Sequence, residues 1–247
     1  MSTTLPGLLA TVLLSGLSLL VGCEGEEAEH RPPPPQERPL AVETPREVPV
    51  GNNVLLEIQG KRRRVLVNAT VCLRQGQLEQ LLCRKNTKEH EAILSAAVDA
   101  RKIHEALLLA GATEGSPVQY QPAYRPPTGQ TIKVILEYKQ EGKVVSVPAR
   151  SWVKNSKTGK ELDIDWVFAG SRLVADPFDK NKKIYLANDG DVICVSNFET
   201  ALLDLPIRSS ADNSELAYEA FTDRIPPAGT PVTIILEPVP GFKKSGR

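Results

Sequence analysis

The stretch VLLEIQGKRRRVLVNATVCL, residues 54–73, decides the fold class. In its second half, at 65–73, small or apolar side chains recur at every second position. They are Val65, Val67, Ala69, Val71 and Leu73. A period of two residues places one strongly apolar face on one side of a β-strand. Gln59 and Gly60 separate this run from a second apolar run at 54–58, so the stretch predicts two strands joined by a turn.

Outward from this stretch, the same kind of pattern predicts six further strands. They lie at 131–138, 143–147, 164–168, 183–187, 191–196 and 231–237. Asp189 and Gly190 separate two of these runs, and both residue types tolerate a positive φ. The sequence therefore predicts a tight hairpin at these two residues.

One helix is predicted at 99–110. Asp99 can cap its start and Gly111 can end it. Its apolar face is predicted to consist of Ala100, Ile103, Leu107 and Ala110. The predicted strands outnumber the helices, which argues against a doubly wound parallel sheet. We therefore expect residues 51–247 to form an α+β fold, a mostly antiparallel sheet with one packed helix, and we expect Ile103 and Leu107 to face strands such as 131–138 and 231–237.

The N-terminus has the pattern of a lipoprotein signal peptide. Residues Leu5 to Val21 carry no charge and precede Leu20-Val21-Gly22-Cys23. This tetrapeptide resembles the bacterial lipobox, in which the signal peptide is removed and the cysteine thiol receives a diacylglycerol. We therefore expect a signal peptide at 1–22 and lipid attachment at Cys23. Residues Met1 to Thr4 contain no Lys or Arg, which departs from the usual pattern and leaves an uncleaved anchor as the alternative.

Residues 23–50 are expected to form the lipidated cysteine followed by a disordered, Pro-rich and Glu-rich tether. Residues 24–50 hold seven prolines and seven glutamates, and almost no large apolar side chain. Such a composition cannot fill a core, and prolines favour an extended chain. We expect the domain to be held at a membrane of the bacterial cell envelope by its lipid, facing the periplasm or the exterior.

Composition and charge narrow the possible partners. The chain has 247 residues with 30 basic and 30 acidic side chains and a sequence pI near 6.8. This balance provides no field for nonspecific nucleic-acid binding, so we expect no nucleic-acid partner. The four cysteines, at 23, 72, 83 and 194, contain no C-x-x-C pair. We therefore expect no cysteine-bound metal and no cofactor.

Several segments, in their order along the chain, resemble the YdjY-like domain family. They are 88–94 (KEHEAIL), 103–107 (IHEAL), 115–118 (GSPV), 166–171 (WVFAGS), 189–193 (DGDVI) and 225–232 (IPPAGTPV). The resemblance covers about 60–240, and the tethered form resembles lipoproteins of planctomycete-type bacteria. It implies no established reaction. Some relatives are described as ferredoxin-like, but Cys72, Cys83 and Cys194 lack the spacing of an iron–sulfur cluster.

Candidate chemistry is sparse. Glu89-His90-Glu91 and His104-Glu105 suggest metal ligands, but no H-E-x-x-H spacing exists. In one continuous helix His90 and His104 would lie about 21 Å apart, which is too far for one ion. Gly170-Ser171 is not a nucleophile elbow, and a turn-capping role accounts for Ser171. We therefore expect no catalytic, cofactor or metal residues, and only weak ligand-contact candidates at Lys88, His90, Glu91 and Ser171.

The three cysteines of the domain are an odd number, so we expect at least one buried free thiol. If a two-residue turn at 75–76 joined two paired strands, Cys72 would lie about 13 Å from the partner of Cys83. A Cys72–Cys83 disulfide would then need a longer loop.

Two hypotheses of function remain. The first is an exported, membrane-anchored lipoprotein whose domain is noncatalytic and binds an unidentified envelope partner. The second is an exported metal-binding or hydrolytic protein that uses His90 and Glu91. Whether the protein is an enzyme stays open, with the first hypothesis favoured because the anchor and spacer are clear and no catalytic set is.

Overall fold

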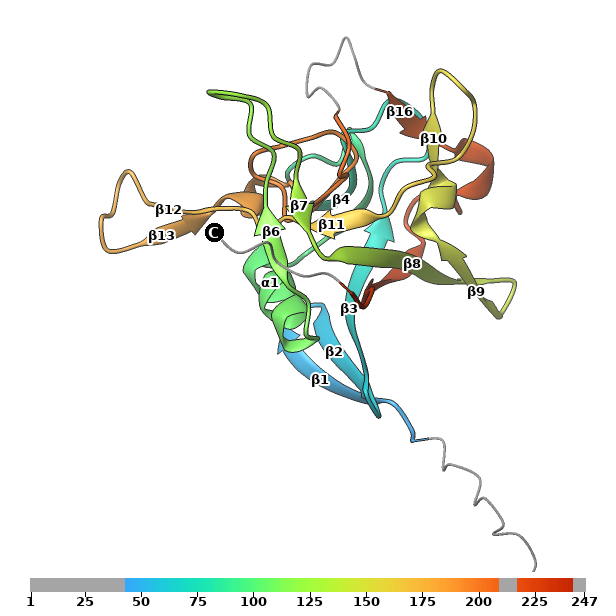
Figure 1. Cartoon of the computed structure of the whole chain (residues 1–247). Helices are drawn as coiled ribbons and strands as arrows, with labels where there is room; N and C mark the ends of the chain where they lie inside the picture. The colour runs from blue at the N-terminus through green and yellow to red at the C-terminus, as the bar shows by residue number, and fades with distance from the viewer. Residues whose placement is uncertain (1–42, 209–216, 242–247) are drawn as a thin grey trace, which may run out of the picture. The chain divides into compact units, whose positions relative to one another are not determined.

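The computed structural model describes residues 43–208 and 217–241, and their central feature is a closed barrel of eight strands (Figure 1). In spatial order the barrel strands are β3 (Arg62–Val71), β17 (Pro231–Pro238), β8 (Thr131–Gln140), β11 (Trp166–Phe168), β15 (Leu203–Asp204), β14 (Ile193–Cys194), β4 (Gln80–Arg84) and β5 (Ala92–Ala96). Pairing of β5 with β3 closes the ring. The expected α+β fold is therefore wrong, since the domain is mostly β with one helix.

The length of β3 explains the closure. One edge of this ten-residue strand pairs with β17 from Val65 to Thr70. The other edge is shared, because β2 (Val54–Gln59) pairs with it from Arg62 to Val67 and β5 pairs at Thr70 and Val71. A strand that exchanges one neighbour for another along a single edge bends a sheet back onto itself. Hydrophobic alternation does not distinguish this arrangement from an open sheet.

The remaining elements extend or cover the barrel. β1 (Arg46–Gly51) pairs with β2, and β9 (Lys143–Pro148) pairs with β8. Three small two-stranded sheets are β10 (Val153–Asn155) with β16 (Tyr218–Ala220), β12 (Leu173–Ala175) with β13 (Lys183–Tyr185), and β6 (Glu114–Ser116) with β7 (Thr128–Gly129). In the described ranges, the helical elements are α1 (Ala100–Leu109) and the 3-10 turns η1 (Ala149–Trp152), η2 (Leu186–Asp189) and η4 (Thr222–Arg224).

The predicted strand face is confirmed in β3. Val65, Val67, Ala69 and Val71 are buried in the core, and Asn68 and Thr70 between them are exposed, although Leu66 on the opposite face is also buried. Trp166 and Phe168 of β11 are also fully buried in this core. The Trp166 indole donates a hydrogen bond of 2.7 Å to the Cys194 carbonyl oxygen, so its polar atom is satisfied in the interior.

The predicted helix is confirmed, but its packing partners differ. The Asp99 side chain accepts a hydrogen bond from the Arg101 backbone N–H and caps the helix. Ile103 and Leu107 are fully buried, and the chain leaves the helix at Gly111 with a φ of 86°. The helix packs chiefly on β1, β2 and β3, and not on β8 and β17 as the sequence suggested. Of these three strands, β1 lies almost wholly within the segment that the sequence assigns to the tether.

Two further expectations need correction. Arg46 to Val50 belong to strand β1, so the ordered domain begins before Gly51. Asp189 and Gly190 do not form a hairpin, because β13 pairs with β12, while β14 pairs with β4 and β15. The glycine is needed for close packing, since a Cβ at position 190 would lie 2.8 Å from Thr87 Oγ1.

The expected signal peptide, Cys23 and the tether up to residue 42 lie outside the described residues. Within the described ranges, no helix has the length and apolar character to cross a membrane.

Candidate functional site

A cavity of about 440 Å³ lies beside α1, where the chain leaves β11 and where β13 ends. Its walls combine apolar side chains with a few polar groups. They are Arg101, His104, Glu105, Leu108, Glu114, Gly170, Ser171, Leu173 and Tyr185. A cavity of this size, with convergent polar groups in an apolar wall, is typical of small-molecule sites. We call it the His104 pocket.

Ser171 is held in the pocket wall by an unusual backbone conformation. Gly170 and Ser171 have φ values of 92° and 54°, which turn the chain sharply after β11. The left-handed conformation of a non-glycine residue costs roughly 1 kcal/mol and needs support. The Ser171 hydroxyl supplies it by donating to the Thr200 carbonyl oxygen at 2.6 Å and accepting from the Ala187 N–H at 3.0 Å. Ser171 therefore stabilises a turn, in agreement with the interpretation from the sequence.

His104, Tyr185 and Glu114 form a hydrogen-bonded chain across the pocket. His104 Nδ1 lies 2.8 Å from the Tyr185 hydroxyl, and its Nε2 lies 3.2 Å from Glu114 Oε2. The Tyr185 hydroxyl also lies 2.9 Å from the Gly170 carbonyl oxygen, to which it donates. The ring of His104 meets the edges of Phe168 and Tyr185, which fix its plane.

The protonation state of His104 decides how many protons the hydrogen bonds among His104, Tyr185 and Glu114 share. Burial lowers the pKa of His104, although Glu114 opposes this effect. Burial also raises the pKa of Tyr185 well above its usual range. With a neutral imidazole whose Nε2–H donates to Glu114, the single hydroxyl proton of Tyr185 has two acceptors, His104 Nδ1 and the Gly170 carbonyl. This one proton therefore links Tyr185 either to the imidazole or to the turn at Gly170.

A second polar cluster surrounds Lys88. Its ammonium lies 3.0 Å from Asp191 Oδ1, 3.7 Å from Glu91 Oε1 and 3.8 Å from Glu79 Oε2. It also lies 4.6 Å from the centre of the Phe198 ring. Burial raises the pKa of Glu79 to about 7, and the neighbouring Glu91 carboxylate adds to this rise. One cation thus offsets part of the repulsion among three carboxylates.

The four candidates from the sequence do not form one site. Lys88 and Glu91 meet in the Lys88 cluster, while Ser171 lies in the wall of the His104 pocket. The His90 side chain is 76% exposed, and its Nε2 lies 3.6 Å from Glu91 Oε2. The described residues contain no group of three or more His, Cys, Asp or Glu arranged to hold a metal ion.

Thr200 connects the two regions. Its carbonyl oxygen accepts from Ser171, and its hydroxyl donates to Asp191 Oδ2. Asp191 also accepts from Gln80 Nε2 at 3.1 Å. The Gln80 side chain is fully buried, and its Oε1 has no hydrogen-bond partner among the described residues. Polar side chains from distant parts of the chain therefore form one continuous network behind the pocket.

Sequence reasoning missed Glu79, Glu114, Tyr185 and Thr200. Glu114 and Tyr185 are 71 residues apart in number, so no local spacing connects them. Asp191 follows the predicted hairpin residues Asp189 and Gly190, yet it is only 4% exposed and is the nearest carboxylate to the Lys88 ammonium. The sequence signal that could have indicated the Lys88 cluster is the pair of aspartates at 189 and 191 on either side of Gly190.

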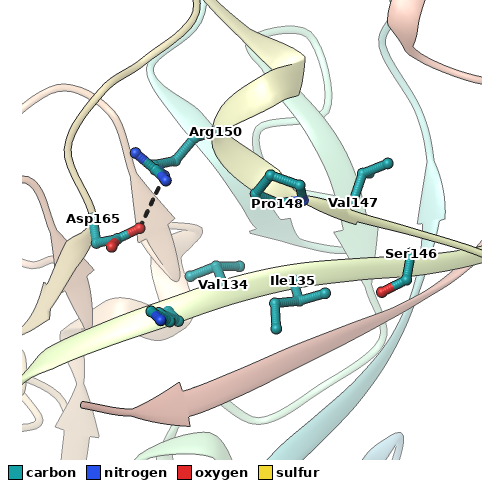
Figure 2. Close-up of a pocket in the computed structure, with 8 residues that line it drawn as sticks. Val134, Ile135, Ser146, Val147, Pro148, Arg150 and Asp165 are labelled. Carbon is teal, nitrogen blue, oxygen red and sulfur yellow. Dashed lines mark ion pairs between the residues drawn. The ribbon is translucent and has the colours of Figure 1, made fainter.

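A different cavity of about 310 Å³ lies between β8 and β9 (Figure 2). Arg150 and Asp165 point toward each other at one end of it, with Arg150 Nε 3.0 Å from Asp165 Oδ1. The other residues that line it include the polar side chains of Lys133 and Ser146.

Cys72, Cys83 and Cys194 are free thiols in this structure, and Cys83 and Cys194 are buried. The predicted register of Cys72 and Cys83 rested on a direct pairing of their strands, which is wrong. Strand β5 lies between β3 and β4, pairing with both. Cys72 Sγ accordingly lies 3.1 Å from the carbonyl oxygen of Ala92, the first residue of β5.

No curated protein and no solved structure matches this chain. A family model described as the YdjY domain matches residues 56–237. The matched region contains the barrel strands except for Pro238, the last residue of β17, together with α1, the His104 pocket and the Lys88 cluster. The chain therefore belongs to the YdjY domain family.

Proposed function

We propose that this protein is a lipid-anchored component of the bacterial cell envelope whose YdjY domain binds a small molecule in the His104 pocket. The observation that carries the proposal is the pocket itself, in which polar groups from four separate segments converge within an apolar wall. Structural polar groups are usually satisfied by one another. Here two carboxylates of the wall, Glu105 and Glu114, keep side chains that are 52% and 44% exposed, so a ligand can reach them.

The charges of the wall favour a ligand with an apolar body and a cationic or hydrogen-bond-donating end. Glu105 and Glu114 contribute two carboxylates. Arg101 contributes less positive field than its charge suggests, because its guanidinium pairs with both oxygens of Asp99 at 2.7–3.1 Å. Leu108 and Leu173 line the wall and are about half exposed, so they can cover an apolar ligand. An amine attached to a phenyl or alkyl group fits these features.

Two compounds with the same apolar body test this chemistry. The binding of 3-phenylpropylamine and of 4-phenylbutyrate, in which one phenylpropyl group carries an ammonium or a carboxylate, would be measured by saturation-transfer NMR on the purified protein. We expect the amine to give the stronger signal, because the carboxylate would face Glu105 and Glu114. Equal signals, or a stronger signal from the carboxylate, would contradict the proposed ligand class.

A pair of neighbouring substitutions locates the binding. Leu108 lines the pocket, whereas Leu109, the next residue of α1, does not and is equally exposed at 50%. Leu108→Asn should abolish binding of the amine, because it removes apolar cover without adding a charge, and Leu109→Asn should leave it unchanged. Both variants replace a leucine by the same residue in the last turn of the helix, so their effect on helix propensity is matched. Loss of binding in both variants, or in neither, would place the ligand elsewhere.

The anchor is tested separately. The lipobox at Leu20 to Cys23 supports lipid attachment, as does the acidic, Pro-rich segment that follows it. Cys23→Ser should move the protein from the membrane fraction to the soluble fraction of its own cells. Unchanged processing and membrane retention would show that the lipobox interpretation is wrong.

A further inference from the structure

The ribbon formed by β12 and β13 extends away from the barrel as a separate two-stranded sheet (Figure 1). All three residues of β12 are exposed, including Leu173 at 53% and Val174 at 37%. Phe178, in the loop that joins the two strands, is 98% exposed. No other large apolar side chain of the described residues is as exposed. An aromatic ring held fully in water among other exposed apolar groups marks an interaction surface.

The loop that carries Phe178 is held by its own hydrogen bonds. Asp176 Oδ1 accepts from the backbone N–H groups of Phe178 at 2.8 Å and Asp179 at 3.2 Å. The Asp179 carbonyl oxygen accepts from the Lys182 N–H, and the Lys182 carbonyl oxygen accepts from the Asp176 N–H. The ring is therefore presented on an ordered turn, which reduces the entropy lost when a partner is bound.

The ribbon is also basic. Residues 172–184 contain four cations, Arg172, Lys180, Lys182 and Lys183, and two carboxylates. Both carboxylates are engaged within the loop, Asp176 with backbone N–H groups and Asp179 with Lys182 at 3.0 Å. Lys180 and Lys183 are exposed. An exposed aromatic ring among cations is suited to the boundary between lipid headgroups and acyl chains, where the ring enters and the cations meet anionic headgroups.

We propose that the β12–β13 ribbon docks on an anionic lipid bilayer, with Phe178 inserted at the headgroup boundary and Lys180 and Lys183 against the headgroups. A bilayer fits better than a protein, because one ring and a three-residue strand present much less surface than the roughly 800 Å² per partner of a stable protein interface. A bilayer needs no complementary shape. Nucleic acid fits less well, because it provides no apolar phase for Phe178.

This inference rests on the proposed lipid anchor. So small an insertion gives only weak and reversible membrane binding, as does a single acyl chain. Attachment through Cys23 would convert docking of the ribbon into an intramolecular step with a high effective concentration. Docking would then orient the domain at the surface, and Leu173, which belongs to both the ribbon and the His104 pocket, would bring the pocket near the lipid.

The test uses the full lipidated protein in vesicles and a tryptophan at the tip. Phe178→Trp would be reconstituted in phosphatidylglycerol–phosphatidylcholine vesicles whose acyl chains carry bromine, which quenches nearby tryptophan. Trp152 and Trp166 are at most 1% exposed, so the unsubstituted protein supplies their constant background. The matched control is Val144→Trp, at a residue of β9 that is 66% exposed.

We expect the emission of Trp at 178 to be quenched and shifted to the blue, and that of Trp at 144 to be unaffected. Pure phosphatidylcholine vesicles, or the added substitutions Lys180→Glu and Lys183→Glu, should reduce the quenching. If both tryptophans are quenched, any exposed residue meets the lipid and the ribbon is not a specific docking element. If neither tryptophan is quenched, the bilayer proposal is overturned. The same holds if the emission of Trp at 178 shifts to the blue only when envelope proteins are added.

Flotation of the same samples separates the two proposals. If the lipidated protein floats with the vesicles and Trp at 178 is not quenched, the anchor stands and the ribbon proposal fails. If the lipidated protein does not float, the anchor proposal fails, and the ribbon proposal that depends on it fails with it.

Discussion

Replacing Leu107 by Ala tests how the helix that carries His104 is held. Leu107 is fully buried in the core, and its helix α1 packs on β1, β2 and β3. Truncating a buried leucine to alanine removes its transfer free energy and leaves a cavity, at a cost of about 2–5 kcal/mol. For a domain of this size, that loss corresponds to a decrease in Tm of roughly 4–20 °C.

Leu108→Ala is the matched control for this prediction. Leu108 follows directly in the same helix but is 47% exposed. The change in helix propensity is the same at both positions, so it cancels in the comparison. We expect Leu108→Ala to change the free energy of unfolding by less than about 1 kcal/mol.

The assay is a denaturant titration of both variants and of the unsubstituted protein, with the slope compared as well as the midpoint. If Leu107→Ala costs less than about 1 kcal/mol, or no more than Leu108→Ala, the helix is not anchored through its predicted apolar face. The reasoning that places His104 on a rigid element would then be refuted.

Further predictions concern single titratable groups. A hydrogen bond with the Cys83 thiol lowers the pKa of Cys72, whereas that contact and burial raise the pKa of Cys83, so iodoacetamide near neutral pH should label Cys72 first. Peptide mass spectrometry that finds equal labelling would contradict this. Burial raises the pKa of Glu79 from its usual 4.5 to about 7, so the stability it contributes is complete below 4.5 and is lost as the pH rises through 7. Glu79→Gln should therefore flatten the dependence of the denaturation midpoint on pH in that window, and an unchanged slope would speak against a protonated Glu79. His90→Ala should alter the free energy of unfolding by less than about 0.5 kcal/mol, because the side chain is 76% exposed, and a loss as large as that of Leu107→Ala would mean that the residue is structural.

Local structure was predictable because each long strand carries its own periodicity. The runs at 54–58, 65–73, 131–138 and 231–237 correspond to β2, β3, β8 and β17. Strand β14 was harder to predict. Only Ile193 and Cys194 pair in it, and the residues before and after them, Val192 and Val195, are buried as well. A continuous apolar run gives no alternation from which to infer a partner or a direction.

The barrel was not predictable from these patterns, because closure depends on which strands become neighbours. Strands β14 and β15 pair in parallel, and so do β4 and β5, which an antiparallel meander does not contain. Asp189 and Gly190 also have the residue types of a hairpin turn, but in the structure the glycine allows close packing instead. The glycine there admits Thr87 and Lys88 at close range, and that contact is visible only when the turn at 86–90 is in place.

Closure of the barrel also explains why residue spacing in the sequence does not predict the site. His104 lies on α1 and Tyr185 at the end of β13, yet their side chains meet at 2.8 Å. The segment between them runs through β8 and β11, so their contact requires both strands to take their places in the barrel. The polar network behind the pocket is therefore coupled to the long-range pairing of the fold. A change that opened the seam between β3 and β5 would displace α1 and its histidine, although neither strand supplies a residue to the pocket wall.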